Sequence, residues 1–167
     1  MVEIRQARME DAGNILELLG QLAKFEKMEE KFKPDHDKFR LHLSVHRNPY
    51  LGAYVAFEGD EMIGVAVFYQ GEYSTFGSSW RIYLEDVFVR QDHRGKGVMR
   101  KLLAPLAKMV REFDLNEISL TVLDWNTNAI DAYDSLGATM TGHKVDEDGR
   151  KWLCMSFRGE ALSILAG

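Results

Sequence analysis

A short loop with two glycines and two basic residues lies between a predicted strand and a predicted helix. The loop is Arg94-Gly95-Lys96-Gly97. Residues 82–89 before it are rich in β-branched and aromatic side chains, as strands are, and apolar residues at three- and four-residue steps over 98–113 predict a helix. Glycine lets a backbone approach a ligand closely, and the unpaired amides at a helix start bind anions. The loop therefore predicts a phosphate or pyrophosphate site.

The residues that follow the loop exclude two common phosphate motifs. A P-loop would need Lys and then Ser or Thr after the second glycine, where this chain has Val98-Met99. A dinucleotide-binding loop would need a third glycine at the position of Lys101. From the loop alone, a basic turn with two glycines and no ligand stays open as an alternative.

The elements around the loop follow in the order β-α-α-β-β-β-α-β-α-β-β. We expect strands at 2–7, 50–57, 62–69, 82–89, 118–123, 138–145 and 151–157, and helices at 10–25, 35–47, 98–113 and 126–136. We expect a polar connection over 71–79 and a kink in the third helix at Pro105. This order predicts an α/β (α+β) fold, with one mixed, mostly antiparallel sheet and helices on both faces. It predicts a single domain over residues 1–167.

Composition limits the possible classes of function. The 167 residues are 46% hydrophobic and 28% charged, as in an ordinary soluble globular protein. A net charge of -5 argues against a nucleic-acid partner and permits a cationic substrate. No apolar run has the length of a signal region or a membrane span, so we expect a cytoplasmic protein with no membrane partner. His42 and His46 share a predicted helix face without an evident third ligand, so we expect no metal site.

Three further motifs accompany the loop and carry a family resemblance. The loop fits the pattern Gln/Arg-x-x-Gly-x-Gly/Ala at Arg94 and Gly97, and departs from it at Met99. The other motifs are Leu22-Ala23-Lys24-Phe25-Glu26-Lys27-Met28-Glu29-Glu30, Tyr83-Leu84-Glu85-Asp86-Val87-Phe88-Val89, and Asp124-Trp125-Asn126 followed by Ile130-Asp131-Ala132-Tyr133. With them the chain resembles the GNAT superfamily of N-acetyltransferases, and within it the diamine (spermidine/spermine) N-acetyltransferase group.

The resemblance implies acetyl-CoA as acetyl donor and assigns roles to individual residues. The residues implied in cofactor binding are Val87, Phe88 and Val89 through their backbone, Arg94, Gly95, Lys96, Gly97, Val98 and Met99 around the pyrophosphate, and Asn126 and Tyr133. The residues implied at the amine are Phe25, Glu26, Glu85 and Asp86. Tyr133 would also protonate the departing thiolate. The resemblance further implies a homodimer.

The chemistry of acetyl transfer requires these residue types. A primary amine with a pKa near 10 is protonated at neutral pH and must lose a proton before it attacks the thioester directly. Glu85 is the best candidate base, directly or through water, and a tyrosine phenol is a suitable acid for the thiolate. Glu85 and Asp86 point to opposite faces of an unbroken strand, so they share a site only if a bulge lies there.

Several alternatives stay open at this stage. The leading expectation is an acetyl-CoA-dependent N-acetyltransferase that acts on a small cationic diamine or polyamine. The first alternative is the side-chain amine of an amino acid such as a lysine analogue, and the second is a CoA-binding module with lost activity. Tyr133 and Phe25 are open to a core role instead of a site role. Asp146-Glu147-Asp148 is expected to be solvated, and Cys154 to be packed and unreactive. We expect the apolar tail 161–166 to be a subunit contact or disordered.

Overall fold

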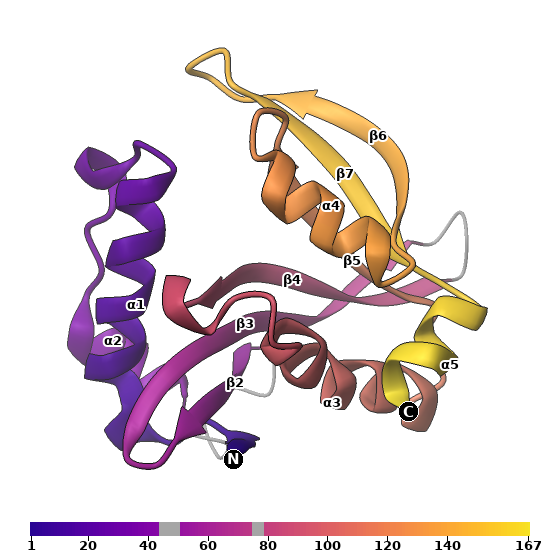
Figure 1. Cartoon of the computed structure of the whole chain (residues 1–167). Coiled ribbons are helices and arrows are strands. Elements are labelled where there is room, and N and C mark those ends of the chain that lie inside the picture. Colours follow the sequence, from indigo (N-terminus) through magenta and orange to yellow (C-terminus); the bar gives the residue numbers. More distant parts are fainter. Residues whose placement is uncertain (44–50, 75–78) are drawn as a thin grey trace. The chain divides into compact units, whose positions relative to one another are not determined.

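The structure, a computed structural model, describes residues 1–43, 51–74 and 79–167 (Figure 1). Within these residues the strands form one sheet in the order β1-β2-β3-β4-β5-β7-β6. The pairs β1–β2, β2–β3, β5–β7 and β6–β7 are antiparallel, and the pair β4–β5 is parallel. The α/β class with a mixed, mostly antiparallel sheet is therefore confirmed. The chain falls into two compact units, residues 1–70 with 86–102 and residues 71–85 with 103–167, which are described separately below. The single domain over 1–167 stays a prediction.

The first unit is built on the hairpin of β2 (Leu51–Glu58) and β3 (Glu61–Ser74), with β1 (Val2–Gln6) at its edge. A 3-10 turn (Met9–Asp11) leads into α1 (Ala12–Phe25), and a second turn (Glu29–Lys31) leads to α2 (His36–His42). The Asp35 side chain caps α2 by accepting from the Lys38 amide at 2.9 Å. Residues 44–47 of the predicted helix, which include His46, and Tyr50 of the predicted strand lie outside the described residues.

The core of the first unit lies between α1 and one face of β2 and β3. Ile15, Leu18 and Leu19 are buried there with Val55 and Val65. On the other face of β3, a Cβ added to Gly64 would lie 3.2 Å from Leu102 of α3 (Val98–Glu112). Successive strand residues point to opposite faces, so helices cover both faces of this part of the sheet, as predicted.

The second unit is centred on β5 (Glu117–Leu123). This strand pairs with β7 (Lys151–Phe157), which pairs in turn with β6 (Thr139–Val145). Its other neighbour is β4 (Ser79–Val89), which pairs with β5 over residues 81–84. The helix α4 (Thr127–Ser135) lies along β5 and β7 (Figure 1). The unit therefore positions α4, the element that carries Tyr133, directly after β5.

The polar connection expected over 71–79 is too long, and disorder, one of the two alternatives for the tail, is wrong. A subunit contact of the tail stays a prediction. Residues 71–74 belong to β3 and Ser79 belongs to β4, so only 75–78 of the expected polar connection lie outside the described residues. The tail is neither disordered nor exposed as a whole, because Glu160–Ala166 forms the helix α5 with Leu162, Leu165 and Ala166 buried within the chain. The helix α3 continues through Pro105, and the kink stays a prediction.

Candidate active site

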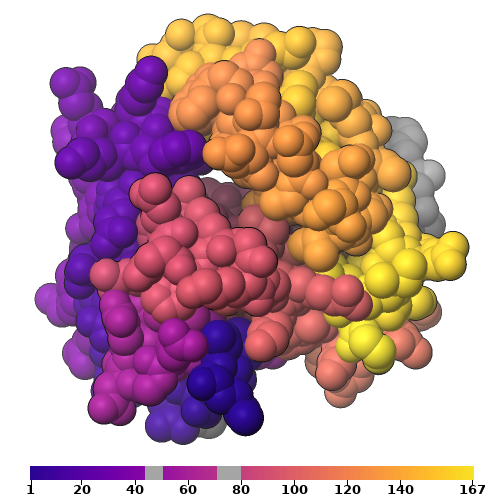
Figure 2. Space-filling model, viewed as in Figure 1, coloured from indigo at the N-terminus to yellow at the C-terminus, as the bar shows by residue number. Residues whose placement is uncertain are grey.

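The predicted phosphate loop is exposed and needs both of its glycines for its backbone conformation. Gly95 has φ +71° and Gly97 has φ +74°, in the left-handed region that favours glycine. A Cβ added at either position would meet nothing within 4 Å. The segment, rose in Figure 2, lies open on the face shown there. The space that a phosphate group would need above the loop is therefore not filled by the chain itself.

The helix α3 begins directly after the loop. Its first main-chain bond runs from the Lys101 amide to the Gly97 carbonyl at 3.2 Å, so the Val98 and Met99 amides precede the first helical bond. The Val98 side chain is buried and that of Met99 is half-buried. A contact of Val98 with a cofactor would therefore come from its backbone. The first turn of α3 offers the amides that bind anions at helix starts.

The start of the loop is fixed to the turn between β2 and β3. The Arg90 amide donates to the Ile63 carbonyl at 2.9 Å, and the Arg90 guanidinium pairs with Glu61 at 2.6 Å. His93 is buried, with Nε2 3.0 Å from Glu58 and Nδ1 3.0 Å from Asp92. The Asp92 carboxylate, and then that of Glu58, raise the pKa of His93 above its ordinary value. Glu61 and Glu58 of the hairpin thus contact Arg90 and His93, which lie just before the loop.

The Arg94 side chain is turned toward β4 and α1. Its Nε donates to the Val89 carbonyl at 2.9 Å. Its guanidinium carbon lies 5.7 Å from the centre of the Phe88 ring and 5.9 Å from that of the Phe25 ring. Both distances are within the range of a cation–π contact. Arg94 therefore connects the end of β4 with the end of α1.

The end of α1 has a capping motif that is usually built with glycine. The Met28 amide donates to the Ala23 carbonyl at 2.8 Å and the Lys27 amide to the Lys24 carbonyl at 3.1 Å, which is the Schellman pattern. Lys27 has φ +57° in the position where glycine is common. Phe25, the last residue of α1, is 41% exposed, so the core alternative for Phe25 is wrong. Glu26 follows it, half-buried.

The predicted carboxylates of β4 fall on either side of the division between the two units. Glu85 is exposed and Asp86 is half-buried. The strand β4 pairs with β5 over the four residues up to Leu84, which lies opposite Leu120. Beyond Glu85 the strand belongs to the first unit, where Phe88 and Val89 are buried and Val87 is half-buried. A shared site for Glu85 and Asp86 stays a prediction.

Asn126 directly precedes α4 and Tyr133 lies within it, and each side chain contacts other residues of the second unit. The Asn126 side-chain oxygen caps the helix by accepting from the Ala129 amide at 3.3 Å. Tyr133 is buried, and its ring meets Phe157 edge-on with 6.4 Å between ring centres. The capping role of Asn126 was missed, although asparagine before the first helical turn is a known cap signal.

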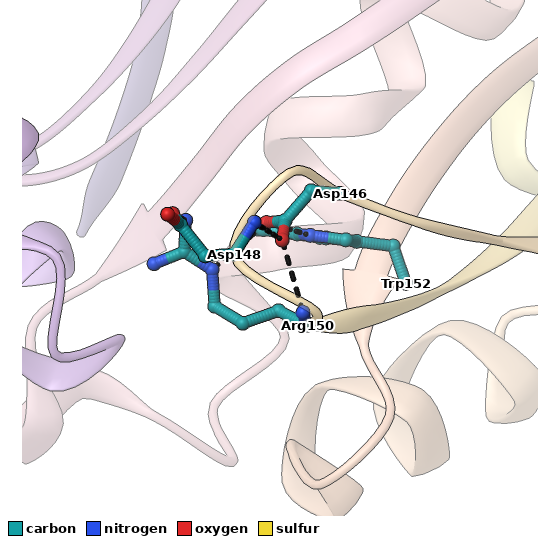
Figure 3. Close-up of polar contacts among 4 residues, drawn as sticks. All are labelled: Asp146, Asp148, Arg150 and Trp152. Atoms are coloured by element: carbon teal, nitrogen blue, oxygen red, sulfur yellow. Dashed lines mark hydrogen bonds and ion pairs between the residues drawn. The ribbon is translucent and has the colours of Figure 1, made fainter.

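The turn between β6 and β7 is more ordered than its charge suggests (Figure 3). The Asp146 carboxylate accepts from the Trp152 indole at 3.0 Å, from the Arg150 Nε at 2.8 Å, and from the Asp148 and Arg150 amides at 3.0 and 2.9 Å. These hydrogen bonds, that of Trp152 first, hold the pKa of Asp146 well below its ordinary value. Arg150 also pairs with Asp148. The expectation of a merely solvated charge run is therefore wrong for Asp146.

Comparison with known proteins identifies the family. The model of the Acetyltransferase (GNAT) family matches residues 16–138, which is most of the chain. The chain belongs to the GNAT acetyltransferase family. The predicted enzyme class, an N-acetyltransferase with acetyl-CoA as donor, is thereby confirmed.

Individual relatives cover almost the whole chain. A thialysine N-epsilon-acetyltransferase from Bos taurus is 34% identical over 172 residues, which are 99% of this chain and 98% of that protein. A spermidine/spermine N(1)-acetyltransferase-like protein 1 from Homo sapiens is 28% identical over 98% of this chain, but over 24% of its own length. A Salmonella typhimurium acetyltransferase structure with its cofactor acetyl-CoA has a TM-score of 0.74 at 22% identity, over 94% of this chain and 93% of that one. The similarity to this solved structure supports the assignment of the fold.

The residues that the structure describes contain no group of three or more His, Cys, Asp or Glu side chains placed to hold a metal ion. Among the same residues no helix combines the length and the apolar character that a membrane crossing requires.

Proposed function

We propose that this acetyltransferase acts on the side-chain amine of a basic amino acid of the lysine-analogue type. The observation that carries the proposal is the similarity to a thialysine N-epsilon-acetyltransferase over nearly the full length of both chains. Small diamines or polyamines are the second candidate class, favoured by the similarity to the spermidine/spermine-like protein and by the net charge of -5. Both classes present a primary amine that is protonated at neutral pH.

We propose that the cofactor binds to the loop and to the end of the strand that leads into it. The exposed loop Arg94–Gly97 and the Val98 and Met99 amides would hold the pyrophosphate, since they combine a helix start with positive charge. The open space at Gly95 and Gly97 fits a group of this kind. The main chain of Val87, Phe88 and Val89 would pair with the pantetheine arm. The Asn126 amide nitrogen would contact the cofactor while its oxygen caps α4.

For the chemistry we propose direct attack of the amine on the thioester in a ternary complex. Glu85, exposed on β4, would take the amine proton, directly or through water. Tyr133 would donate its phenol proton to the departing thiolate. Asp86, Glu26 and Phe25 would face the acceptor. We further propose one domain over residues 1–167, a homodimer and a cytoplasmic location, each on the resemblance and composition described above.

The test is acetyl transfer to a panel of amines, read as release of the free CoA thiol. The panel contains thialysine, lysine and ornithine beside putrescine and spermidine. We expect the highest kcat/KM among the amino acids. A preference for spermidine would assign the enzyme to the second class, and no turnover with any amine in the presence of tight CoA binding would favour a module without activity.

The role of Tyr133 is tested with Tyr133→Phe, which removes only the hydroxyl. We expect turnover to fall by a factor on the order of 10² to 10⁴ with unchanged CoA affinity. A tyrosine whose function is to pack on Phe157 would instead lower the melting temperature and leave turnover within a few-fold of wild type.

A further inference from the structure

We propose that Arg94 is a positioning residue that couples the cofactor loop to the acceptor-facing end of α1. The family resemblance assigns this arginine to the pyrophosphate. Here its Nε is bound to the Val89 carbonyl at 2.9 Å, and its guanidinium lies within 6 Å of the Phe88 and Phe25 rings. The inference rests on the proposed function, because it assumes that the loop binds acetyl-CoA and that the end of α1 faces the amine.

The three contacts of Arg94 belong to two structural elements within the first unit. Val89 and Phe88 lie at the end of β4, Phe25 ends α1, and Arg94 itself opens the exposed part of the loop. The Val89 side chain and the Phe88 ring are buried, so the strand end is a fixed support. Phe25 is 41% exposed, and its ring centre lies 5.9 Å from the Arg94 guanidinium carbon. The guanidinium therefore transmits the position of the loop to α1.

The geometry requires an arginine and not merely a positive charge. A guanidinium can donate from Nε to a carbonyl while its flat face lies near aromatic rings. A lysine ammonium is a point charge without a planar face and has no second donor group along its stem. Arg94→Lys would keep the charge for a phosphate but lose the connection between Val89 and Phe25. The Arg94→Lys variant therefore separates the effect of losing this connection from the effect of losing the positive charge.

The segment after Phe25 is the one that the coupling would control. Residues 26–28 form the capping turn with its left-handed Lys27, and Glu26 is one of the proposed acceptor contacts. If the loop closes on a bound CoA, Arg94 would hold Phe25, and with it this turn, in one position. Cofactor binding would then improve acceptor binding, and by linkage the acceptor would improve cofactor binding by the same factor.

The experiment is a double-mutant cycle with Arg94→Gln, Phe25→Ala and the double variant, with Arg94→Lys beside them. We expect Arg94→Lys to keep the acetyl-CoA KM near that of wild type but to raise the acceptor KM as much as Phe25→Ala does. In the double variant the rise in acceptor KM should be smaller than the product of the single rises, by a factor of roughly 2 to 5, the usual strength of an exposed cation–π contact. Multiplicative effects in the cycle, or an acceptor KM that Arg94→Lys leaves unchanged, would overturn the proposal.

Two matched controls and one binding measurement complete the design. Arg111→Gln and Phe113→Ala remove an exposed arginine and an exposed phenylalanine at the far end of α3, and we expect both to leave the two KM values unchanged. Hydrogen exchange should show that CoA slows amide exchange over residues 22–31 in wild type and in Arg111→Gln, but not in Arg94→Gln. Equal slowing in Arg94→Gln would overturn the coupling.

Different experimental results would refute the coupling and the proposed function. If the protein binds CoA but acetylates no amine of the panel, the hydrogen-exchange comparison decides the coupling on its own. If it does not bind CoA, the proposed function is wrong. The cycle is then measured as melting temperatures of the free protein, where additive effects of Arg94→Gln and Phe25→Ala overturn the contact and non-additive effects support it.

Discussion

Replacing Gly97 by alanine tests whether the loop is the phosphate site. Gly97 has φ +74°, and the left-handed conformation costs alanine about 1–2 kcal/mol. No atom lies within 4 Å of the added Cβ, so no clash adds to this cost. The loop is exposed, and in the free protein it can relax to a conformation that suits alanine.

The expected effect therefore falls on binding more than on stability. A bound pyrophosphate needs the loop in its original conformation, so CoA binding must restore the strained backbone of Gly97→Ala. A cost of about 1–2 kcal/mol weakens the CoA Kd by roughly 5- to 30-fold. The melting temperature should fall by no more than a few degrees, since about 1 kcal/mol corresponds to about 2–4 °C in a chain of this size.

The matched control is Gly149→Ala in the turn between β6 and β7. Gly149 has φ +77°, also with nothing within 4 Å of an added Cβ, and its amide donates to the Asp146 carbonyl at 3.0 Å. This turn is held by the hydrogen bonds of Asp146, so the strain should appear as lower stability with unchanged CoA affinity. Calorimetric titration with CoA and thermal melting measure both quantities. A CoA Kd for Gly97→Ala within two-fold of wild type would refute the assignment of the loop, and equal weakening by Gly149→Ala would show a general loss of stability.

Three further predictions concern capping and charge. Lys27→Gly should raise the unfolding free energy by about 1 kcal/mol, because it relieves the left-handed backbone of the α1 cap, as thermal melting will show. Asp11→Asn should lower it by about 1–2 kcal/mol at pH 7, since the Arg5 hydrogen bonds at 2.7 and 2.9 Å are weakened. Arg5 lowers the pKa of Asp11, so this stability is present above the ordinary aspartate pKa and is lost as the pH falls through the lowered value; the two melting curves should converge in acid. Asp146→Asn should speed amide exchange at Asp148 and Arg150, measured by hydrogen exchange, because a neutral amide accepts more weakly than a carboxylate.

The sequence predicts a regular element correctly where a long periodic pattern of apolar residues coincides with the buried face of that element. The helix α1 was predicted from Ile15, Leu18 and Leu19, which are all in the core. The same pattern included Phe25, three residues after Leu22, but α1 ends there and the ring lies largely beyond the core. Periodicity describes the direction of a side chain around the helix, whereas burial also depends on whether the partner surface extends that far.

Short elements and polar turns were harder to predict for a different reason. The helix α5 has seven residues, with Leu162 and Leu165 inward, a pattern too short to distinguish from a random apolar tail. The turn around Asp146 was interpreted from its charge, yet its order depends on Trp152, six residues away on the returning strand. A contact across a hairpin has no signature in a local window, although acidic turn residues followed by arginine would have been a useful hint.

The electrostatics of the cofactor loop illustrates the same limit and changes how the loop is understood. Counted from the sequence, Arg90, His93, Arg94 and Lys96 make one basic cluster. In the structure, Glu61 and Glu58 from the β2–β3 hairpin hold the first two, and the Nε of Arg94 is directed to the Val89 carbonyl. These carboxylates lie about thirty residues before the loop in the chain, so spacing could not reveal them. We therefore expect the charge offered to a phosphate to come chiefly from Lys96 and the amides of the first turn of α3, with the other basic residues fixing the loop in place. Lys96→Ala should then weaken CoA binding more at low salt than at high salt, because an exposed charge is screened by added ions.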